Sequence, residues 1–402
     1  MSSVGANKKF IKKIIYLFIF LMLFYIFSLT ISMAINTSSI TDNALKSIDK
    51  LMNEGYGWST FRFYTLASSA DNPTDILMLQ NSMQLNGQNC LYNAMNVNNY
   101  ARYWHGYLIL LKPLLMFTDI QGIRIINMVI FYTLIMYLLI NLKETCQSYM
   151  LPLSLLIGLI MCYIYIIPIS MQYMSVFIIM LICSLLVLKN KGNIKRLYLI
   201  LFTVGSIVNF FDFLTVPILS MGVPIIIYIY INYNEKTFSI LMKEVILLSV
   251  YWCLGYGLTW ISKWIVGSLI LNRNIIVEGV KQSLFRINGS TEYVIDYKRM
   301  LHDNILNFFG KKEYFYCYIG IVCSSFLYLC FKLKKEIISL LPLLFVASYP
   351  FIWLLILGNH SQIHYYMTYR NILVFFLAMN IFVVEAFKIN IIKIKNKERV
   401  IK

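Results

Sequence analysis

The sequence predicts an all-α, polytopic membrane protein with about ten transmembrane helices and one re-entrant or interfacial segment. Hydrophobic residues make up 59% of the 402 residues and charged residues only 13%, whereas about a quarter of a soluble domain is charged. The mean hydropathy of +0.69 agrees with this contrast, and long apolar runs recur along the chain. This composition excludes an ordinary cytosolic enzyme and a disordered chain.

The apolar runs supply the predicted spans, because a helix needs about 17–25 apolar residues to cross a bilayer. The predicted spans are Ile14–Ala34, Ile123–Leu142, Leu151–Pro168, Met171–Leu188, Leu197–Phe211, Leu214–Ile231, Val245–Ser262, Tyr314–Phe331, Ile337–Leu357 and Asn371–Lys388. Leu108–Phe117 is shorter and contains Pro113. Its length favours a re-entrant or interfacial segment over a span.

Basic residues orient these spans, because Lys and Arg collect in cytoplasmic loops. Four lysines precede the first span, and if 108–117 does not cross the membrane, the other short basic connections and the tail fall on the same side. Both termini of this multi-pass protein of the cell membrane are therefore predicted to be cytoplasmic. The 35 basic against 18 acidic residues, a formal net charge of +17, then require no nucleic-acid partner.

This topology divides the chain into five predicted regions. They are an N-terminal anchor helix (1–34), a first extracytoplasmic loop with interfacial helices and the re-entrant segment (35–122), a central transmembrane bundle (123–262), a second extracytoplasmic loop (263–313), and C-terminal transmembrane helices with a basic cytoplasmic tail (314–402). The inner connections are short and carry little but lysine. Functional residues concentrate in loops, so we expect them on the outer face.

The first outer loop contains three acids of interest. Apolar residues within Ile40–Met52 recur at the spacing of an amphipathic helix that lies on the membrane surface. Asp42, early in this helix, either complements the helix macrodipole or acts as a general base at the surface. Asp71 and Asp75 flank a turn sequence that contains Pro73, and a role in the turn or as a helix cap is favoured for both.

The densest motif is the stretch 100–107, which reads Tyr-Ala-Arg-Tyr-Trp-His-Gly-Tyr. An interfacial aromatic belt accounts for Tyr103 and Trp104, but it does not account for Arg102 and His105 among them. Arginine is suited to bidentate binding of phosphate, and aromatic faces suit stacking on sugar rings. The motif is therefore predicted to bind substrate.

Two further sets of residues lie at the outer edge of the predicted spans. His360 and His364, within Gly358–Arg370, have the four-residue spacing of some zinc sites. No acid accompanies them, so an anion-binding cluster with Arg370 is favoured. Asp212 is either functional, as ionisable residues at membrane depth are by default, or it caps the next helix. The basic second outer loop suits an anionic headgroup or a lipid-linked phosphate.

A first helix, a long outer loop with an acid a few residues beyond the membrane, and a multispan body together resemble the GT-C glycosyltransferases. This resemblance covers most of the chain and is architectural rather than motif-specific. It implies that Asp42 is the base that activates the acceptor, with Asp49 as a partner acid. The longer C-terminal extracytoplasmic domain of that family is absent, which leaves the acceptor class open. Four segments also resemble those of multispanning proteins of low-GC Gram-positive bacteria, namely Asp71–Leu79, Ala101–Pro113, Phe211–Pro217 and Asn359–Arg370.

The resemblance implies a bacterial membrane glycosyltransferase that acts at the extracytoplasmic face. It would transfer a sugar from a polyprenyl-phosphate-linked donor to a cell-surface glycan or lipid acceptor, with Arg102, Arg370 and either His105 or His364 holding the phosphate. The predicted partners are that donor, membrane lipid and a cell-envelope glycan, and no nucleic acid. Two alternatives stay open: a polysaccharide polymerase or ligase that acts on lipid pyrophosphate-linked glycans, and a transporter or flippase of a lipid-linked substrate. No cofactor is identified with certainty, and a divalent cation stays open.

Overall fold

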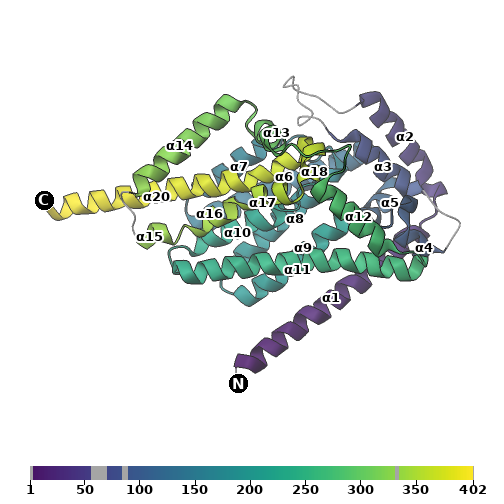
Figure 1. Cartoon of the computed structure of the whole chain (residues 1–402), viewed down its shortest axis with the longest axis horizontal. Coiled ribbons are helices and arrows are strands. Elements are labelled where there is room, and N and C mark those ends of the chain that lie inside the picture. Colours follow the sequence, from purple (N-terminus) through teal and green to yellow (C-terminus); the bar gives the residue numbers. More distant parts are fainter. Residues whose placement is uncertain (1–2, 56–69, 84–88, 331–334, 402) are drawn as a thin grey trace.

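The computed structural model describes residues 3–55, 70–83, 89–330 and 335–401. Within these ranges the chain forms helices joined by turns, and no strand occurs. Figure 1 shows long helices packed side by side, with a group of shorter helices at the end of the bundle where α1 finishes. The predicted class, a helical membrane protein, agrees with this architecture.

Six helical segments in the described part of the chain are long and apolar enough to cross a membrane. They are Lys8–Ala34 of α1 (Ser3–Ala34), α6 (Ile120–Cys146), α8 (Met171–Lys189), α9 (Ile194–Phe211), α11 (Phe238–Leu271), and Tyr365–Lys388, which joins α19 (Tyr365–Thr368) and η3 (Tyr369–Asn371) to the first part of α20 (Ile372–Ile401). Six of the predicted spans are thus confirmed as helices of sufficient length and apolarity.

The number of about ten spans is not confirmed, because three predicted spans form shorter helices. α7 (Met150–Met161) and α10 (Leu219–Asn232) have 12 and 14 residues, or about 18 and 21 Å, against a hydrocarbon core of about 30 Å. The prediction Ile337–Leu357 is divided between α15, α16 and α17, which are Lys335–Ile338, Pro342–Ala347 and Tyr349–Ile356. A proline lies in the first turn of both α16 and α17, where its missing N–H is tolerated. The remaining prediction falls on α14 (Lys312–Cys330) and ends outside the described residues.

Short helices cover one end of the bundle (Figure 1). They are α2 (Ser38–Glu54), α3 (Asn72–Met83), α4 (Cys90–Met95), η2 (Val97–Asn99), α5 (Leu108–Leu115), α12 (Ile275–Asn288), α13 (Tyr297–Phe309) and α18 (Gly358–Ile363). They come from the three stretches that were predicted to lie outside, although 56–69 and 84–88 of the first loop lie outside the described residues. α5 has eight residues, about 12 Å, and is too short to cross the membrane, in agreement with the re-entrant or interfacial prediction.

α11 continues beyond its predicted end. Residues 263–271, predicted to open the second outer loop, instead complete a helix of 34 residues. Lys263 is fully buried in this extension. Its Nζ atom donates to the carbonyl oxygen of Met95 at 3.0 Å and lies 5.4 Å from the centre of the Trp104 ring. The buried lysine therefore joins α11 to α4 and to the motif that follows it.

Glycine permits the closest approach of backbones in the bundle. A Cβ atom on Gly205 in α9 would lie 2.1 Å from the carbonyl oxygen of Trp252, and one on Gly255 in α11 would lie 2.0 Å from that of Phe202. Small residues allow such contacts between membrane helices. In α8, 67% of the most apolar 18-residue window is buried, against 22% in α1 and α6. α8 is therefore central, whereas α1 and α6 leave most of their apolar surface exposed, as expected of helices that face lipid.

Candidate functional site

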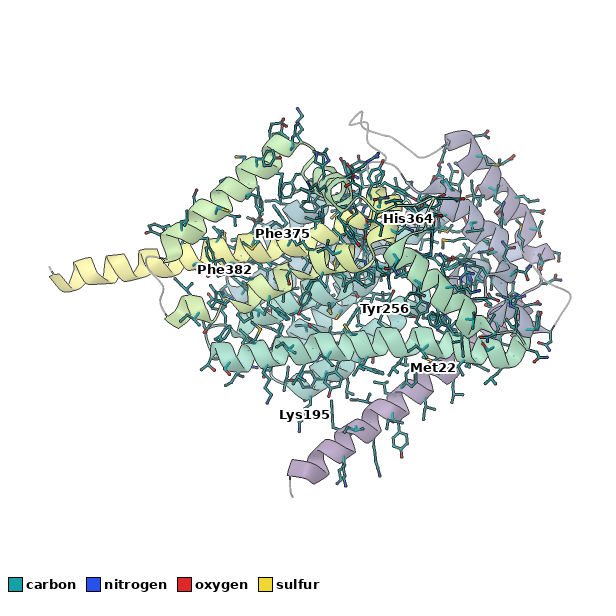
Figure 2. The ribbon with its side chains drawn as sticks, in the orientation of Figure 1. Met22, Lys195, Tyr256, His364, Phe375 and Phe382 are labelled. Atoms are coloured by element: carbon teal, nitrogen blue, oxygen red, sulfur yellow. The ribbon has the colours of Figure 1, made fainter. Side chains whose placement is uncertain are left out.

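A cavity of about 360 Å³ lies among the short helices. Its walls come from α3, η2 and the segment that follows it, the start of α8, the turn after α9, α12, α18, and the residues from the end of α18 into α19. The lining residues are Thr74, Leu77, Asn81, Asn98, Tyr100, Tyr103, His105, Gln172, Phe213, Arg286, His360, His364 and Met367. Figure 2 places His364 at this end of the molecule. No carboxylate belongs to the lining within the described residues, and the volume is that of a small-molecule site.

Two arginines place positive charge at the cavity, Arg286 in its lining and Arg102 behind it. Arg286 in α12 lines the cavity, and its Nη1 atom lies 2.5 Å from Nδ1 of His360. Arg102 stacks on Tyr100, with Cζ 4.3 Å from the ring centre. In the described ranges neither arginine forms an ion pair, and Nε of each is buried without a hydrogen bond. Both arginines are partly buried, and a cation that is withdrawn from water without a compensating charge is costly. This arrangement is therefore suited to binding an anion.

The motif at 100–107 is fixed against the end of α9. The N–H of Gly106 donates to the carbonyl oxygen of Phe210 at 2.9 Å, and a Cβ atom at Gly106 would lie 2.5 Å from that oxygen. Trp104 is buried, and its Nε1 donates to the carbonyl oxygen of Thr259 at 2.8 Å. Trp104, predicted to bind substrate, therefore anchors the loop and does not line the cavity.

An aromatic wall closes one side of the cavity. The rings of Tyr100 and Tyr103 stack with centres 5.3 Å apart, and Phe213 meets Tyr103 edge-on at 5.7 Å. Burial raises the pKa of the Tyr103 hydroxyl far above its ordinary value, so this group keeps its proton. The wall offers π-faces to a bound molecule.

His105 is held as a neutral imidazole. Its Nε2 lies 2.9 Å from the carbonyl oxygen of Tyr100, and because a carbonyl only accepts, Nε2 carries the proton. Nδ1 therefore accepts from the hydroxyl of Tyr107 at 3.3 Å, and that oxygen accepts from Nδ2 of Asn81 at 2.9 Å. Burial lowers the pKa of His105 to about 3. Its φ of 55° lies in the left-handed region, which costs energy for a residue with a side chain.

His360 and His364 lie side by side, with ring centres 4.7 Å apart. Nε2 of His360 donates to the carbonyl oxygen of Leu214 at 2.7 Å, and its Nδ1 accepts from Arg286. Burial lowers the pKa of His360 well below its ordinary value. His364 is only partly buried, and its Nδ1 lies 3.4 Å from the hydroxyl of Tyr366. Burial and the charge of Arg286 lower the pKa of His364 to about 4.

An apolar groove of about 110 Å³ adjoins the cavity. Its lining residues are Met78, Tyr107, Leu110, Leu111, Leu114, Ile123, Asn127, Met171, Met174, Ser175, Ile178 and Phe211. Tyr107 separates the two spaces, because its side chain lines the groove and its hydroxyl bonds the cavity residue Asn81. At the start of α8, Met171 lines the groove and the next residue, Gln172, lines the cavity. Leu110 is 58% exposed, so the groove reaches the exposed surface of α5.

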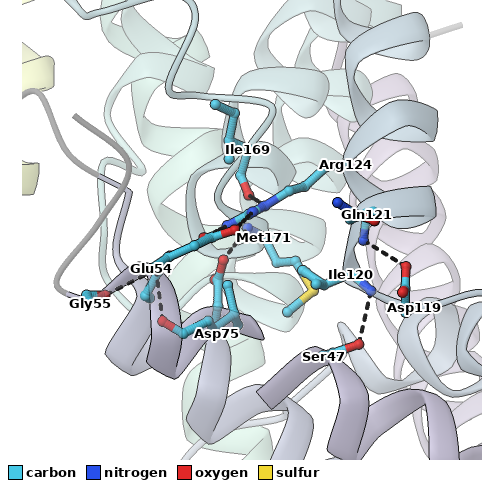
Figure 3. A network of polar contacts seen from close by, with 12 residues as sticks. Ser47, Glu54, Gly55, Asp75, Asp119, Ile120, Gln121, Arg124, Ile169 and Met171 are labelled. Carbon is cyan, nitrogen blue, oxygen red and sulfur yellow. Dashed lines mark hydrogen bonds and ion pairs between the residues drawn. The ribbon is translucent and has the colours of Figure 1, made fainter. Parts of the chain in front are cut away.

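A cluster of polar residues, which we call the clamp, consists of Glu54, Asn72, Asp75 and Arg124 and is built on one ion pair. Figure 3 shows Glu54, Asp75 and Arg124 close together. The guanidinium of Arg124 binds both carboxylate oxygens of Glu54, at 2.8 and 3.0 Å, and its Nε donates to the carbonyl oxygen of Ile169 at 3.0 Å. Asn72 donates to Glu54 and accepts from Arg124 at 3.3 and 3.4 Å. These bonds join the end of α2 to α3, α6 and the turn before α8.

The two acids at and just before the start of α3 accept hydrogen bonds from backbone N–H groups. Asp71 accepts from the N–H of Thr74 at 3.3 Å and from its hydroxyl at 2.8 Å, as predicted for a turn or cap. Asp75 caps a different helix from the one expected, because it accepts from the N–H groups of Met171 and Gln172 at the start of α8, at 3.0 and 3.2 Å. Burial raises the pKa of Asp75 to about 8, and the charge of Asp71 acts in the same direction, against these two bonds.

Asp212 also accepts hydrogen bonds, and these lie within its own turn. Its carboxylate accepts from the N–H of Thr215 at 3.0 and 3.2 Å and from the Thr215 hydroxyl. α10 begins only at Leu219, so Asp212 stabilises the turn between two helices and does not cap the second one. Burial raises the pKa of Asp212 to about 6. Asp212 is not among the residues that line the cavity.

The structure separates three other predicted residues from the cavity. Arg370 is fully buried, and it donates to the carbonyl oxygens of Cys162 and Tyr366, each at 3.2 Å, which joins η3 to the end of α7. Asp42 and Asp49 lie on the exposed face of α2. None of the three lines the cavity.

The predicted residues that meet at the cavity are Tyr103, His105, His360 and His364, with Arg102 behind Tyr100. The sequence indicated only the basic character of the predicted second outer loop, to which Arg286 belongs. Its partner His360 is 74 positions away, and no local sequence pattern predicts that contact.

No group of three or more metal-ligating side chains occurs in the residues that the structure describes. No protein-family model, no curated protein and no solved structure matches the chain. The cavity, the groove and their chemistry are therefore the basis on which a function is proposed.

Proposed function

We propose that the chain is a membrane enzyme that transfers a sugar from a polyprenyl-phosphate-linked donor to a glycan or lipid acceptor. The observation that carries this proposal is the adjacency of two spaces. One is a cavity lined by Arg286, which has no acidic partner in the described residues, and the other is an apolar groove that reaches the exposed surface of α5. A lipid-linked phosphate has the same two parts, an anionic head and an apolar chain. The GT-C resemblance of the sequence is compatible with this substrate class.

The charge of the cavity supports an anionic head. Arg286 lines it, Arg102 lies behind its aromatic wall, and no acid of the described chain lines it. His360 accepts from Nη1 of Arg286, which fixes the guanidinium and leaves its remaining N–H groups for a ligand. A guanidinium that is oriented before the substrate arrives also stabilises the charge that develops on a leaving phosphate.

The groove supports an apolar chain. It lies between α3, α5, α6 and α8, and Leu110 at its edge is exposed. Each methylene that moves from water into such a groove contributes about 0.8 kcal/mol, although a chain that is already in the bilayer gains less. The small volume suits only the part of the chain next to the phosphate, and the rest would remain among the lipids.

The remaining lining supports a sugar. Tyr100, Tyr103 and Phe213 offer ring faces. Oδ1 of Asn81 and Oε1 of Gln172 are buried acceptors without a hydrogen bond in the described ranges, and such atoms call for a partner. Sugar hydroxyls donate hydrogen bonds, so they would satisfy these two oxygens.

A polymerase or ligase that acts on lipid pyrophosphate-linked glycans would use the same two spaces and stays the second candidate. Two adjacent phosphates would engage Arg102 as well as Arg286. The length of the product separates the two functions, because a transferase adds one sugar and a polymerase extends a chain.

Binding of a polyprenyl monophosphate to the purified chain in lipid nanodiscs tests the proposal. Arg286→Gln should weaken binding at least tenfold, because it removes a charge-assisted contact worth about 1.5–3 kcal/mol. Arg299→Gln is the matched control, since the Arg299 side chain is 77% exposed on α13, and it should bind within about twofold of the wild type.

Binding of the neutral polyprenol of the same chain length distinguishes the contribution of the phosphate head from that of the isoprenoid chain. If the cavity binds the phosphate, polyprenol should bind at least tenfold more weakly than the monophosphate. Equal binding of the two lipids, or unchanged binding by Arg286→Gln with an unchanged unfolding temperature, would contradict the proposal.

A further inference from the structure

The proposed transfer needs a group that accepts the proton of the attacking hydroxyl. No carboxylate lines the cavity in the described part of the chain. The neighbouring acids Asp71 and Asp212 direct their oxygens to Thr74 and Thr215 in their own turns. Burial raises the pKa of Tyr103, so its hydroxyl is a poor base. The three imidazoles of the lining remain.

Two of these imidazoles are committed to fixed hydrogen bonds. His105 donates to the carbonyl oxygen of Tyr100 through Nε2, and His360 donates to that of Leu214 through Nε2. A carbonyl oxygen cannot donate, so neither Nε2 can lose its proton without losing its bond. Nδ1 of each ring accepts from another side chain. Neither ring can therefore exchange a proton at low cost.

His364 differs from both. Its ring contacts no carbonyl oxygen through a hydrogen bond, and Nε2 has no hydrogen bond with any described residue. Its Nδ1 faces the hydroxyl of Tyr366 at 3.4 Å, and a hydroxyl can both donate and accept. Either tautomer of His364, and its protonated form, is thus compatible with the surroundings.

We propose that His364 is the general base of the cavity, an inference that rests on the proposed function. The acceptor hydroxyl gives its proton to Nε2 of His364 while its oxygen forms a bond to the anomeric carbon of the sugar. The bond between that carbon and the phosphate oxygen breaks, and its electron pair stays on the phosphate, beside Arg286. The proton then passes from His364 to the released phosphate or to water, which restores the neutral ring.

The charges around His364 fit this role. The groups that face it are Arg286 from α12, His360 from α18 and Tyr366 from α19, and Asp71 lies near Tyr366. Burial and Arg286 keep the ring neutral at pH 7, with a pKa of about 4. A phosphate bound at Arg286 adds negative charge, and negative charge raises the pKa of a neighbouring imidazole. Donor binding would therefore make His364 a stronger base.

Nuclear magnetic resonance of the histidine rings tests this inference without sugar transfer. The chain has four histidines, and 15N-labelled histidine in the full chain in nanodiscs reports the tautomer and titration of each. The His364 resonance is assigned from His364→Gln, and exposed His302 is the reference. Polyprenyl monophosphate should raise the titration midpoint of His364 by at least one pH unit, while His105 and His360 keep the Nε2–H tautomer throughout.

The outcomes separate the two proposals. If the lipid phosphate binds with the expected loss in Arg286→Gln but the His364 midpoint does not move, the inference about His364 is wrong and the proposed function stands. A His364 ring fixed as the Nε2–H tautomer, as in the other two histidines, would also overturn it. If the lipid phosphate does not bind at all, the proposed function fails and the inference falls with it.

A second variant measurement distinguishes a base from a binding residue. His364→Gln should bind polyprenyl monophosphate within about threefold of the wild type and should reduce glycan transfer in membranes by about 10²–10⁴-fold, the usual contribution of general base catalysis. Added imidazole should restore part of the transfer in His364→Gly, and His302→Gln should behave as the wild type. Transfer within tenfold of the wild type by a folded His364→Gln would contradict the assignment.

Discussion

The clamp and the cavity lie on opposite faces of α3. The arginine of the clamp is paired with an acid, whereas the arginine of the cavity is not. In the clamp, Arg124 binds both oxygens of Glu54, and each side chain is less than a tenth exposed. In the cavity, Arg286 has no acidic partner in the described residues, and its Nε makes no hydrogen bond. On α3, Asn72 and Asp75 belong to the clamp, whereas Thr74, Leu77 and Asn81 line the cavity.

This difference teaches how to separate structural from functional charges in a membrane protein. Both regions bury ionisable groups, and both lie at the same end of the bundle. Where every polar atom has a partner, the group holds helices together, and its removal leaves an uncompensated charge. Where a cation is left without one, the missing partner is expected to be a ligand. The following predictions test this distinction.

Arg124→Ala should cause the largest loss of stability. It leaves the carboxylate of Glu54 buried without a counter-charge, which costs about 3–5 kcal/mol. Arg273→Ala is the matched control, because the Arg273–Glu278 pair is 40% and 34% exposed and such a pair contributes about 0–1 kcal/mol. The free energy of unfolding in mixed detergent micelles measures both. Similar losses in the two variants would show that the clamp is not structural.

Arg286→Met should show the opposite behaviour. The substitution removes a cation that has no counter-charge, so the free energy of unfolding should change by less than about 1 kcal/mol, while binding of polyprenyl monophosphate falls at least tenfold. Unfolding and binding are measured on the same preparation. A stability loss as large as that of Arg124→Ala would place Arg286 with the structural charges.

Acidification should destabilise the protein through its locked histidines. His105 has a pKa of about 3 in the folded chain and about 6.5 when unfolded, so its contribution to stability is present above pH 6.5 and is lost as the pH falls from about 6.5 toward 3. At pH 5 the loss of stability amounts to about 2 kcal/mol. The unfolding midpoint should fall between pH 7.5 and pH 5, and less so in His105→Gln. His302→Gln, at an exposed site, should follow the wild type, and an equal fall in all three proteins would contradict the explanation.

Asp42→Asn should have the smallest effect. Asp42 is exposed on α2 and does not line the cavity, so both unfolding and lipid-phosphate binding should stay within the error of the wild type. Glycan transfer should also be retained. Loss of transfer with normal binding would instead support the base that the GT-C resemblance implies, and would displace His364 from that role.

The class of fold was predictable because it depends on local composition. A run such as Ile14–Ala34 is apolar throughout, and α1 forms there as expected. Composition does not define helix ends that depend on tertiary contacts. The prediction Leu151–Pro168 stops as a helix at Met161, where the chain turns back toward Arg370, and α11 continues past Ser262 because Lys263 finds partners in Met95 and Trp104.

The candidate site was predictable only in part, for a similar reason. The histidines and the aromatic motif stood out because ionisable residues are rare in this chain. The role of each depends on contacts far apart in sequence. Asp42 and His364 are both ionisable residues near the predicted outer edge, yet one is exposed on α2 and the other faces the cavity. Arg286 gained its importance only from its position beside His360.

A structure of the chain with a bound polyprenyl monophosphate tests the central claim most directly. We predict that the phosphate lies within hydrogen-bonding distance of Arg286 and beside His364. The first isoprene units should pass Tyr107 and enter the apolar groove, which has Leu110 at its edge. A phosphate bound elsewhere on the chain, with Arg286 and His364 untouched and the groove empty, would contradict the assignment of the cavity.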